Sequence, residues 1–243
     1  MVCLCDSRDS PTTKMSPWKI SLLVLALVVY IITLVMNALA GRGSQSGPFY
    51  QSVGNISKKY DTELTPAGWT FSIWGVIYTW QAVWLLYACI GLCRRSALTW
   101  MPSILSCPFY IIWITNNLLN IGWLFLWDRE YIIPALAFLA LIAFTNYVAL
   151  FFTYRALHTQ LPWMQKYRKI DMWLVRILIQ NGLAVYATWT TIATLINFAV
   201  VLTYSGCISN VTSGSIWKML CLINMCVTHL LSIQLLLWHY QDL

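Results

Sequence analysis

The chain has 243 residues, of which 59% are hydrophobic and only 9% are charged. Soluble domains carry about 25% charged residues, so this composition excludes an ordinary soluble domain. The net charge of +7 does not indicate nucleic-acid binding, because the basic residues flank apolar segments and form no continuous stripe. We therefore expect the lipid bilayer as a partner, and no nucleic acid.

Long apolar blocks without a charged residue predict helices that cross the membrane. About 20 apolar residues span the hydrocarbon core of a bilayer. The chain therefore predicts an all-α fold, a polytopic transmembrane helical bundle of about six spans. We expect a single domain over residues 20–243, after a cytoplasmic tail at 1–19. The predicted spans, in chain order, are 20–40, 69–92, 104–127, 131–154, one within 172–204 whose first turns (172–181) lie in the interface or extend past it, and 215–238.

Two features of the loops predict the orientation. With the N-terminus on the cytoplasmic side, most basic residues lie in inner segments, as the positive-inside rule requires. The acceptor sequons at Asn55 and Asn210 both fall in outer loops, so we predict them as glycosylation sites. Both termini are then inside. Used sequons favour the plasma membrane or the secretory pathway over the mitochondrial outer membrane.

The predicted spans hold almost no charged residue but many neutral amides and hydroxyls. The lack of carboxylates argues against a proton relay, a cation-coupled carrier or an acid–base enzyme at mid-membrane. We therefore expect no catalytic residue, no metal and no required cofactor. An amide in hydrocarbon needs a partner, so these side chains either bond to neighbouring helices or line a cavity.

Fourteen tryptophans are the second unusual feature of the spans. Those at span ends are typical of aromatic belts at the membrane surface, but others lie well inside the spans. An indole ring is large and flat and carries one N–H donor, which suits a pocket for a flat apolar ligand. Core packing accounts for the same residues equally well.

Three motifs combine these tryptophans and amides at fixed spacings. The fifth span carries Y-x-x-W-x-x-x-A-x-x-x-N, and the third carries L-N-x-x-W. The start of the second span has tryptophan and phenylalanine at alternating positions. It is similar to the motif P-x-W-x-F-G-P-V-W-x-x-L-Y, but it has one residue fewer between Phe71 and Trp74 than that motif has. That loss rotates the following helix face by about 100°. The motif residues are Tyr186, Trp189, Ala193, Asn197, Leu119, Asn120, Trp123, Pro66, Trp69, Phe71, Trp74 and Tyr78.

In this order and in these spans, the motifs resemble the TspO/MBR family, the translocator protein and tryptophan-rich sensory proteins. The resemblance covers residues 20–204, so the sixth span is expected to be an addition to the five of the family. It implies a ligand cavity closed by the loop between spans 1 and 2, and a porphyrin, haem or sterol as ligand. Carried over by position, the ligand-binding residues are Trp69, Phe71, Trp74, Asn120, Trp123, Trp189, Ala193 and Asn197.

The function that we expect is that of a membrane receptor or transporter-like protein. It would bind a flat hydrophobic small molecule, of the tetrapyrrole or sterol class, in an intramembrane pocket lined by tryptophan and asparagine, and would not be an enzyme. The alternative is a non-catalytic membrane scaffold or accessory subunit without a small-molecule ligand. A homodimer is an assembly that the sequence leaves open.

Overall fold

The computed structural model describes residues 17–43, 47–62, 65–93, 104–206 and 215. Within these ranges all regular elements are helices. Five of them are long and apolar enough to cross a membrane, which confirms the predicted all-α transmembrane bundle. The predicted sixth span lies outside the described residues, as does the tail up to residue 16. Because α1 begins at Pro17, the end of the predicted tail is already helical.

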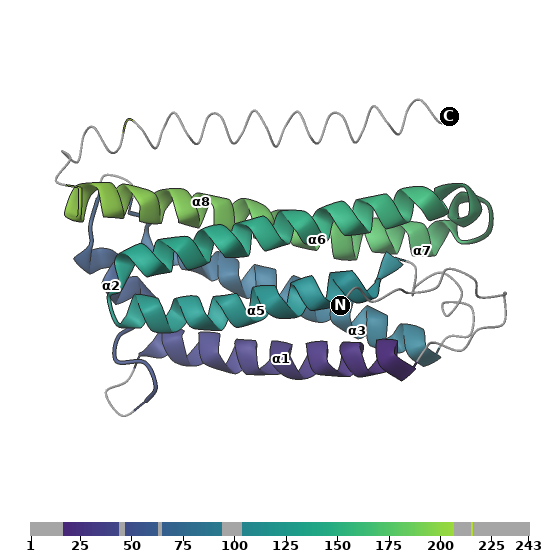
Figure 1. Ribbon diagram of the computed structural model, residues 1–243, viewed down its shortest axis with the longest axis horizontal. Helices are drawn as coiled ribbons and strands as arrows, with labels where there is room; N and C mark the ends of the chain where they lie inside the picture. Colours follow the sequence, from purple (N-terminus) through teal and green to yellow (C-terminus); the bar gives the residue numbers. More distant parts are fainter. Residues whose placement is uncertain (1–16, 44–46, 63–64, 94–103, 207–214, 216–243) are drawn as a thin grey trace, which may run out of the picture.

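The five long helices lie side by side along one axis (Figure 1). A short helix, α2, sits in the connection between α1 and α3, and we call the end of the bundle that carries it the α2 end. The elements are α1 (Pro17–Arg42), α2 (Val53–Lys59), the 3₁₀ helix η1 (Gly68–Ser72), α3 (Ile73–Cys93), α5 (Cys107–Asp128), α6 (Ile132–Tyr167), α7 (Lys169–Leu174), the π-helical segment η2 (Val175–Gln180) and α8 (Asn181–Tyr204).

The helices pack as an incomplete ring. Helix α1 packs on α5, α5 on α6, and α6 on α8, each over an extensive interface, while α3 lies against α8 and η2. By contrast, α1 and α3 touch only sparsely. The ring is therefore loosely closed along the seam between α1 and α3.

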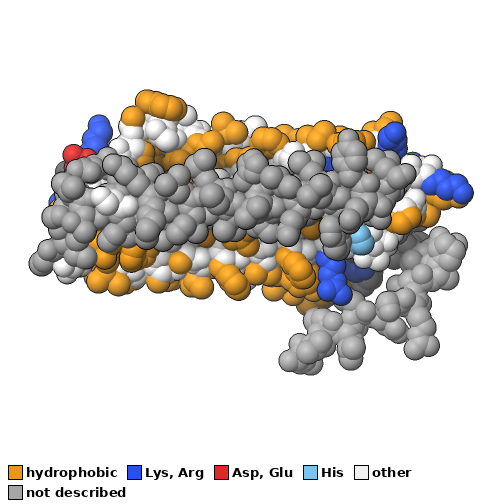
Figure 2. All heavy atoms as spheres, turned by 90° about the horizontal axis from the view of Figure 1, so that it is seen from above, with side chains coloured by type: hydrophobic (Ala, Val, Ile, Leu, Met, Phe, Trp, Pro, Cys, Tyr) orange, Lys and Arg blue, Asp and Glu red, His pale blue; other side chains and the backbone are white. Residues whose placement is uncertain are grey.

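The outside of the bundle is apolar along its length. Helix α1 alone exposes Val24, Leu25, Val28, Ile31 and Ile32. Figure 2 shows hydrophobic side chains along the flanks, with the charged ones gathered at the two ends. A water-soluble monomer rarely exposes so large an apolar surface, whereas a surface in contact with lipid tails requires one.

Two of the long helices extend beyond the predicted spans. Helix α6 runs to Tyr167, beyond the predicted end at residue 154, and has 36 residues. At 1.5 Å per residue it is about 54 Å long, which exceeds the hydrocarbon thickness of about 30 Å. The extension carries Arg155 and Lys166, so we place it beyond the hydrocarbon. The segment at 172–181, predicted as the first turns of the fifth span, is helical and continues into α8 through the π-helical turn of η2.

Several buried amides join neighbouring helices. Asn116 Nδ2 donates to the Ile142 carbonyl at 3.0 Å and to Thr145 Oγ1 at 2.8 Å, which links α5 to α6. Asn146 Nδ2 lies 3.4 Å from Thr190 Oγ1, which links α6 to α8. These amides therefore act as interhelical bonds, the structural one of the two roles expected from the sequence.

Candidate ligand-binding site

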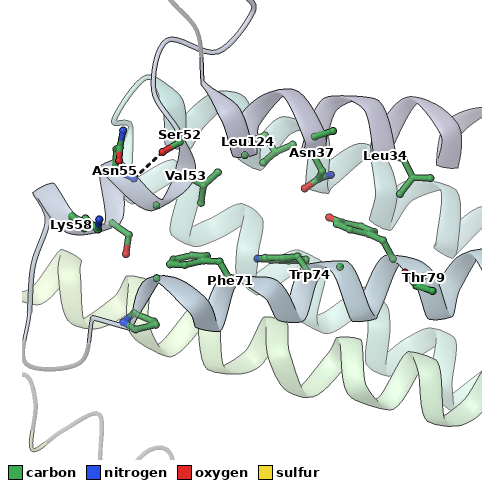
Figure 3. A pocket seen from close by; sticks show the side chains of 18 of the residues that line it. Leu34, Asn37, Ser52, Val53, Asn55, Lys58, Phe71, Trp74, Thr79 and Leu124 are labelled. Carbon is green, nitrogen blue, oxygen red and sulfur yellow. Dashed lines mark hydrogen bonds between the residues drawn. The ribbon is translucent and has the colours of Figure 1, made fainter.

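Two adjoining cavities lie near the α2 end of the bundle. The larger, which we call the chamber, has a volume of about 700 Å³. It runs along the α1–α3 seam under α2 (Figure 3). The smaller, which we call the cleft, has a volume of about 50 Å³ and is walled by α3, α5, α6 and α8. The residues that line both are Val53, Ser57, Pro66, Phe71 and Trp74.

Most of the residues predicted for the site lie around the cleft. Helix α8 presents Trp189, Ala193 and Asn197 as a stripe with a spacing of four residues, which places them on one helix face. The other walls come from α5 and from the start of α3. The predicted residues that line the cleft are Phe71, Trp74, Trp123, Trp189, Ala193 and Asn197.

Trp69 is one of two predicted site residues that line neither cavity; the other, Asn120, is buried. The Trp69 side chain is 79% exposed and lines neither the chamber nor the cleft. The reason is the 3₁₀ turn at residues 68–72, which has about three residues per turn. Residues Phe71 and Trp74, three apart, share one face, and Trp69 points elsewhere. The same tight turn keeps both aromatic residues on the cavity wall although one residue is missing between them.

Trp74 forms the partition between chamber and cleft. Its ring stacks on Tyr78 at a centroid distance of 5.6 Å and lies 6.2 Å from Trp123. Tyr186 and Trp189 meet it edge to face, both at 6.1 Å. These distances fall in the range of favourable aromatic pairs. A single indole therefore connects aromatic side chains from α3, α5 and α8.

The walls of the cleft contain buried polar atoms without a partner among the described residues. They are Nε1 of Trp123, Nε1 of Trp189, and both amide atoms of Asn197. The Asn197 side chain belongs to a residue that is only 2% exposed. A buried polar group without a hydrogen bond destabilises a protein by about 1–3 kcal/mol. The cleft thus offers two N–H donors and one amide to any polar atom that reaches it.

Asn120 lies behind the chamber wall and lines neither cavity. It is completely buried, and its Oδ1 accepts hydrogen bonds from Asn37 Nδ2 at 2.7 Å and from the Tyr78 hydroxyl at 3.3 Å. Asn37 and Tyr78 themselves line the chamber. Asn120 therefore holds two chamber residues, one from α1 and one from α3, in fixed positions.

The sequence prediction missed the contribution of α1 to the chamber. Tyr30, Leu34 and Asn37 project into it from α1, and Figure 3 shows Leu34 and Asn37 facing Trp74 and Thr79. Span 1 has no polar pattern that distinguishes its faces. Asn37, the one amide within residues 20–40, is the signal that could have revealed the inward face.

The segment around α2 closes the chamber at its end and is tied to the turn between α5 and α6. Glu130 accepts bonds from Lys59 Nζ at 2.6 and 2.7 Å, from the Tyr60 hydroxyl at 2.9 Å and from Gln51 Nε2 at 3.2 Å. The Gln51 backbone N–H donates to Asp128 Oδ1 at 3.0 Å. The bonds from Lys59 and then Tyr60 lower the pKa of Glu130. Its carboxylate is therefore ionised at neutral pH.

The first of the two predicted glycosylation sites lies at the chamber rim. Asn55 is exposed and sits in α2, where its backbone N–H donates to Ser52 Oγ at 3.2 Å (Figure 3). Its side chain lines the chamber. Asn210 lies outside the described residues. Use of either sequon stays a prediction.

Comparison with known proteins gives one match. A family model described as TSPO-like protein matches residues 23–243. It therefore takes in the C-terminal segment that we expected to be an addition to the shared spans. No curated protein and no solved structure matches the chain. With five helices able to span a membrane and a match over most of its length, the chain is an integral multi-pass membrane protein that belongs to the family of TSPO-like proteins.

Proposed function

We propose that the protein is a receptor or transporter-like protein that binds a flat hydrophobic molecule of the tetrapyrrole or sterol class. It does so without catalysing a reaction on the ligand. The observation that carries this proposal is the pair of cavities separated by Trp74, with polar atoms that have no partner among the described residues in the walls of the cleft.

The two cavities have different roles in this proposal. The chamber, at about 700 Å³, falls in the range of small-molecule pockets, about 300–1,000 Å³. The cleft, at about 50 Å³, is far too small for a tetrapyrrole or a sterol. The flat body of the ligand therefore lies in the chamber against Phe71 and Trp74. Only one edge of it reaches the cleft, when the Trp74 side chain shifts aside.

The polar atoms of the cleft supply orientation. An acceptor on the ligand edge would receive a hydrogen bond from the indole N–H of Trp189 or of Trp123. Because these groups are already removed from solvent in the protein without ligand, their desolvation is not an additional cost of binding. Each such bond therefore contributes favourably and selects the ligand by the position of its polar edge.

The scaffold hypothesis rests on a different observation. The Nδ2 groups of Asn116 and Asn146 bond to neighbouring helices without any ligand. A bundle held in this way can serve as an accessory subunit. It gives no reason, however, for an indole and an amide that face a cavity without partners, and this difference makes the two hypotheses separable.

Binding of protoporphyrin IX tests the proposal. The purified protein is placed in phosphatidylcholine nanodiscs, and the fluorescence anisotropy of the porphyrin is followed, with empty nanodiscs subtracted. Saturable binding is expected, and Trp189→Phe weakens it about tenfold, because one hydrogen bond of about 1.4 kcal/mol is lost. Trp163→Phe, at the far end of α6, is the matched control and leaves the affinity unchanged.

Two results contradict the proposal, and the first of them favours the scaffold hypothesis. One is porphyrin binding that rises linearly with concentration and equals that of empty nanodiscs, together with the same result for a fluorescent sterol. The other is equal affinity in Trp189→Phe, Trp163→Phe and the unmodified protein, which would place the ligand away from the cleft.

A further inference from the structure

The chamber has a cationic end. Lys58, on α2, lines it, and Figure 3 places Lys58 and Asn55 together on this helix, away from Leu34 and Thr79. None of the lining residues is an aspartate or a glutamate. Within the described part of the chain Lys58 makes no ion pair, whereas Lys59, the next residue, is bound to Glu130 at 2.6 Å.

Among the described residues, no carboxylate pairs with this end. Arg42 directly follows Gly41, a lining residue, in the last turn of α1, and it too has no ion pair within the described ranges. The described carboxylates nearby either have other partners or line neither cavity. Glu130 is bound to Lys59, Asp128 accepts from Gln51, and Asp61 is exposed and lines neither cavity.

The body of the chamber is apolar and aromatic. Moving away from Lys58, the walls are formed by Phe71 and Trp74 on one side and Leu34 on the other, and Tyr30 and Ala82 lie furthest along α1 and α3. No described lining residue in this part is charged. The end of the chamber at Lys58 is therefore complementary to an anionic group, and the rest of the chamber is complementary to a hydrophobic molecule.

From this polarity we infer that the natural ligand is an anionic amphiphile. Its carboxylate, sulfate or phosphate group lies at Lys58, and its flat apolar body lies between Leu34 and Trp74. The inference rests on the proposed function, because it specifies the charge of the same ligand. A neutral sterol would leave the lysine without a counter-ion and would bind more weakly than its anionic derivative.

Matched pairs of ligands test the charge directly. Protoporphyrin IX and its dimethyl ester share one ring system and differ in their carboxylates. Cholesterol sulfate and cholesterol differ in the same way. In phosphatidylcholine nanodiscs, the anionic member of each pair is expected to bind more tightly. Lys58→Gln weakens the anionic member about two- to fivefold, the range for an ion pair that involves an exposed cation.

The variants separate this site from general charge effects. Lys58→Arg keeps the cation and retains the affinity. Lys166→Gln removes one positive charge from the other end of the bundle and changes nothing. Raising the ionic strength weakens the anionic ligands in the unmodified protein, because salt screens exposed charges, and has little effect in Lys58→Gln.

Each remaining outcome decides one of the two proposals. If the neutral and anionic members bind equally, or if Lys58→Gln leaves the binding of the anionic member unchanged, the inference is wrong while the proposed function stands. If none of the four molecules binds saturably, the proposed function fails and the inference fails with it. If only the sterol pair binds, the comparison within that pair decides the inference.

Discussion

Lys59 on α2 and Glu130 in the turn between α5 and α6 lie 2.6 Å apart and join two parts of the chain that are 71 residues apart in sequence. Lys59 is exposed, so this ion pair alone contributes little. Glu130 also accepts hydrogen bonds from Tyr60 and Gln51. One carboxylate therefore holds several points of the segment that covers the chamber.

Replacing Glu130 by glutamine is expected to loosen this segment. The neutral amide keeps the shape of the side chain but loses the charge-assisted bonds from Lys59 and Tyr60. Hydrogen exchange measured by mass spectrometry should show faster exchange over residues 51–60 and no change in α8. Asp61→Asn removes an acid from the same end and serves as the control. Equal exchange in both variants would mean that Glu130 does not hold α2.

The same contact predicts a pH dependence. The pKa of Glu130 is lowered from its ordinary value of 4.5 by the bonds from Lys59 and Tyr60. A lowered pKa means that the stabilisation is present above the ordinary value and is lost as the pH falls through the lowered one. After correction for intrinsic rates, exchange over 51–60 should stay constant from pH 7 to pH 5 and rise below pH 4.5. Loosening already at pH 6 would point to another group.

Gly182 and Gly75 are expected to respond to alanine in opposite directions. A methyl group at Gly182 would lie 2.7 Å from the ring of Trp80, whose indole donates to the Ile177 carbonyl in η2. Such overpacking costs about 1–3 kcal/mol, more than the helix propensity gained, up to about 1 kcal/mol. At Gly75 a methyl group meets nothing within 4 Å. Thermal unfolding in nanodiscs should show a lower midpoint for Gly182→Ala and an unchanged or higher one for Gly75→Ala.

Replacing Asn197 by leucine is expected to raise the stability of the protein and to lower its affinity for the ligand. Leucine at this position removes two buried polar atoms without partners, so the protein without ligand should become more stable by about 1–2 kcal/mol. Porphyrin affinity should fall at the same time. Asn116→Leu is the matched opposite, because it breaks two hydrogen bonds between α5 and α6 and should destabilise the protein. Lower stability in Asn197→Leu would show that its amide has a structural role.

The positions of the spans could be predicted because hydropathy is read directly from the sequence, and long apolar segments are stable in the hydrocarbon core of a bilayer. The position at which α6 ends could not be predicted in this way. Hydropathy falls at Arg155, but a helix ends where its backbone bonds end, and the chain beyond Arg155 continues helical through Pro162 to Tyr167. Apolarity therefore gives the membrane-embedded part of a helix and leaves its water-exposed extension undetermined.

The α8 wall of the cleft was accessible to sequence reasoning, whereas the extent of the chamber along α1 was not. The spacing of four residues in α8 predicts one helix face that carries Trp189, Ala193 and Asn197. In the structure, this face lines the cleft together with Trp74 and Trp123. The chamber depends on a loose α1–α3 seam and on α1 residues such as Leu34, which sequence cannot distinguish from its lipid-facing neighbours. A cavity forms where neighbouring helices leave a gap between them, and the width of that gap depends on tertiary packing rather than on a local sequence pattern.

The 3₁₀ turn at Gly68–Ser72 has an evolutionary consequence. Because winding can tighten there from 3.6 to about three residues, a deletion within this segment need not alter the direction in which Phe71 and Trp74 project. Descendants of a common ancestor could thus differ in length at this point and keep the same aromatic surface. Gaps between related chains are expected to accumulate in this turn, and rarely in the regular helices that follow it.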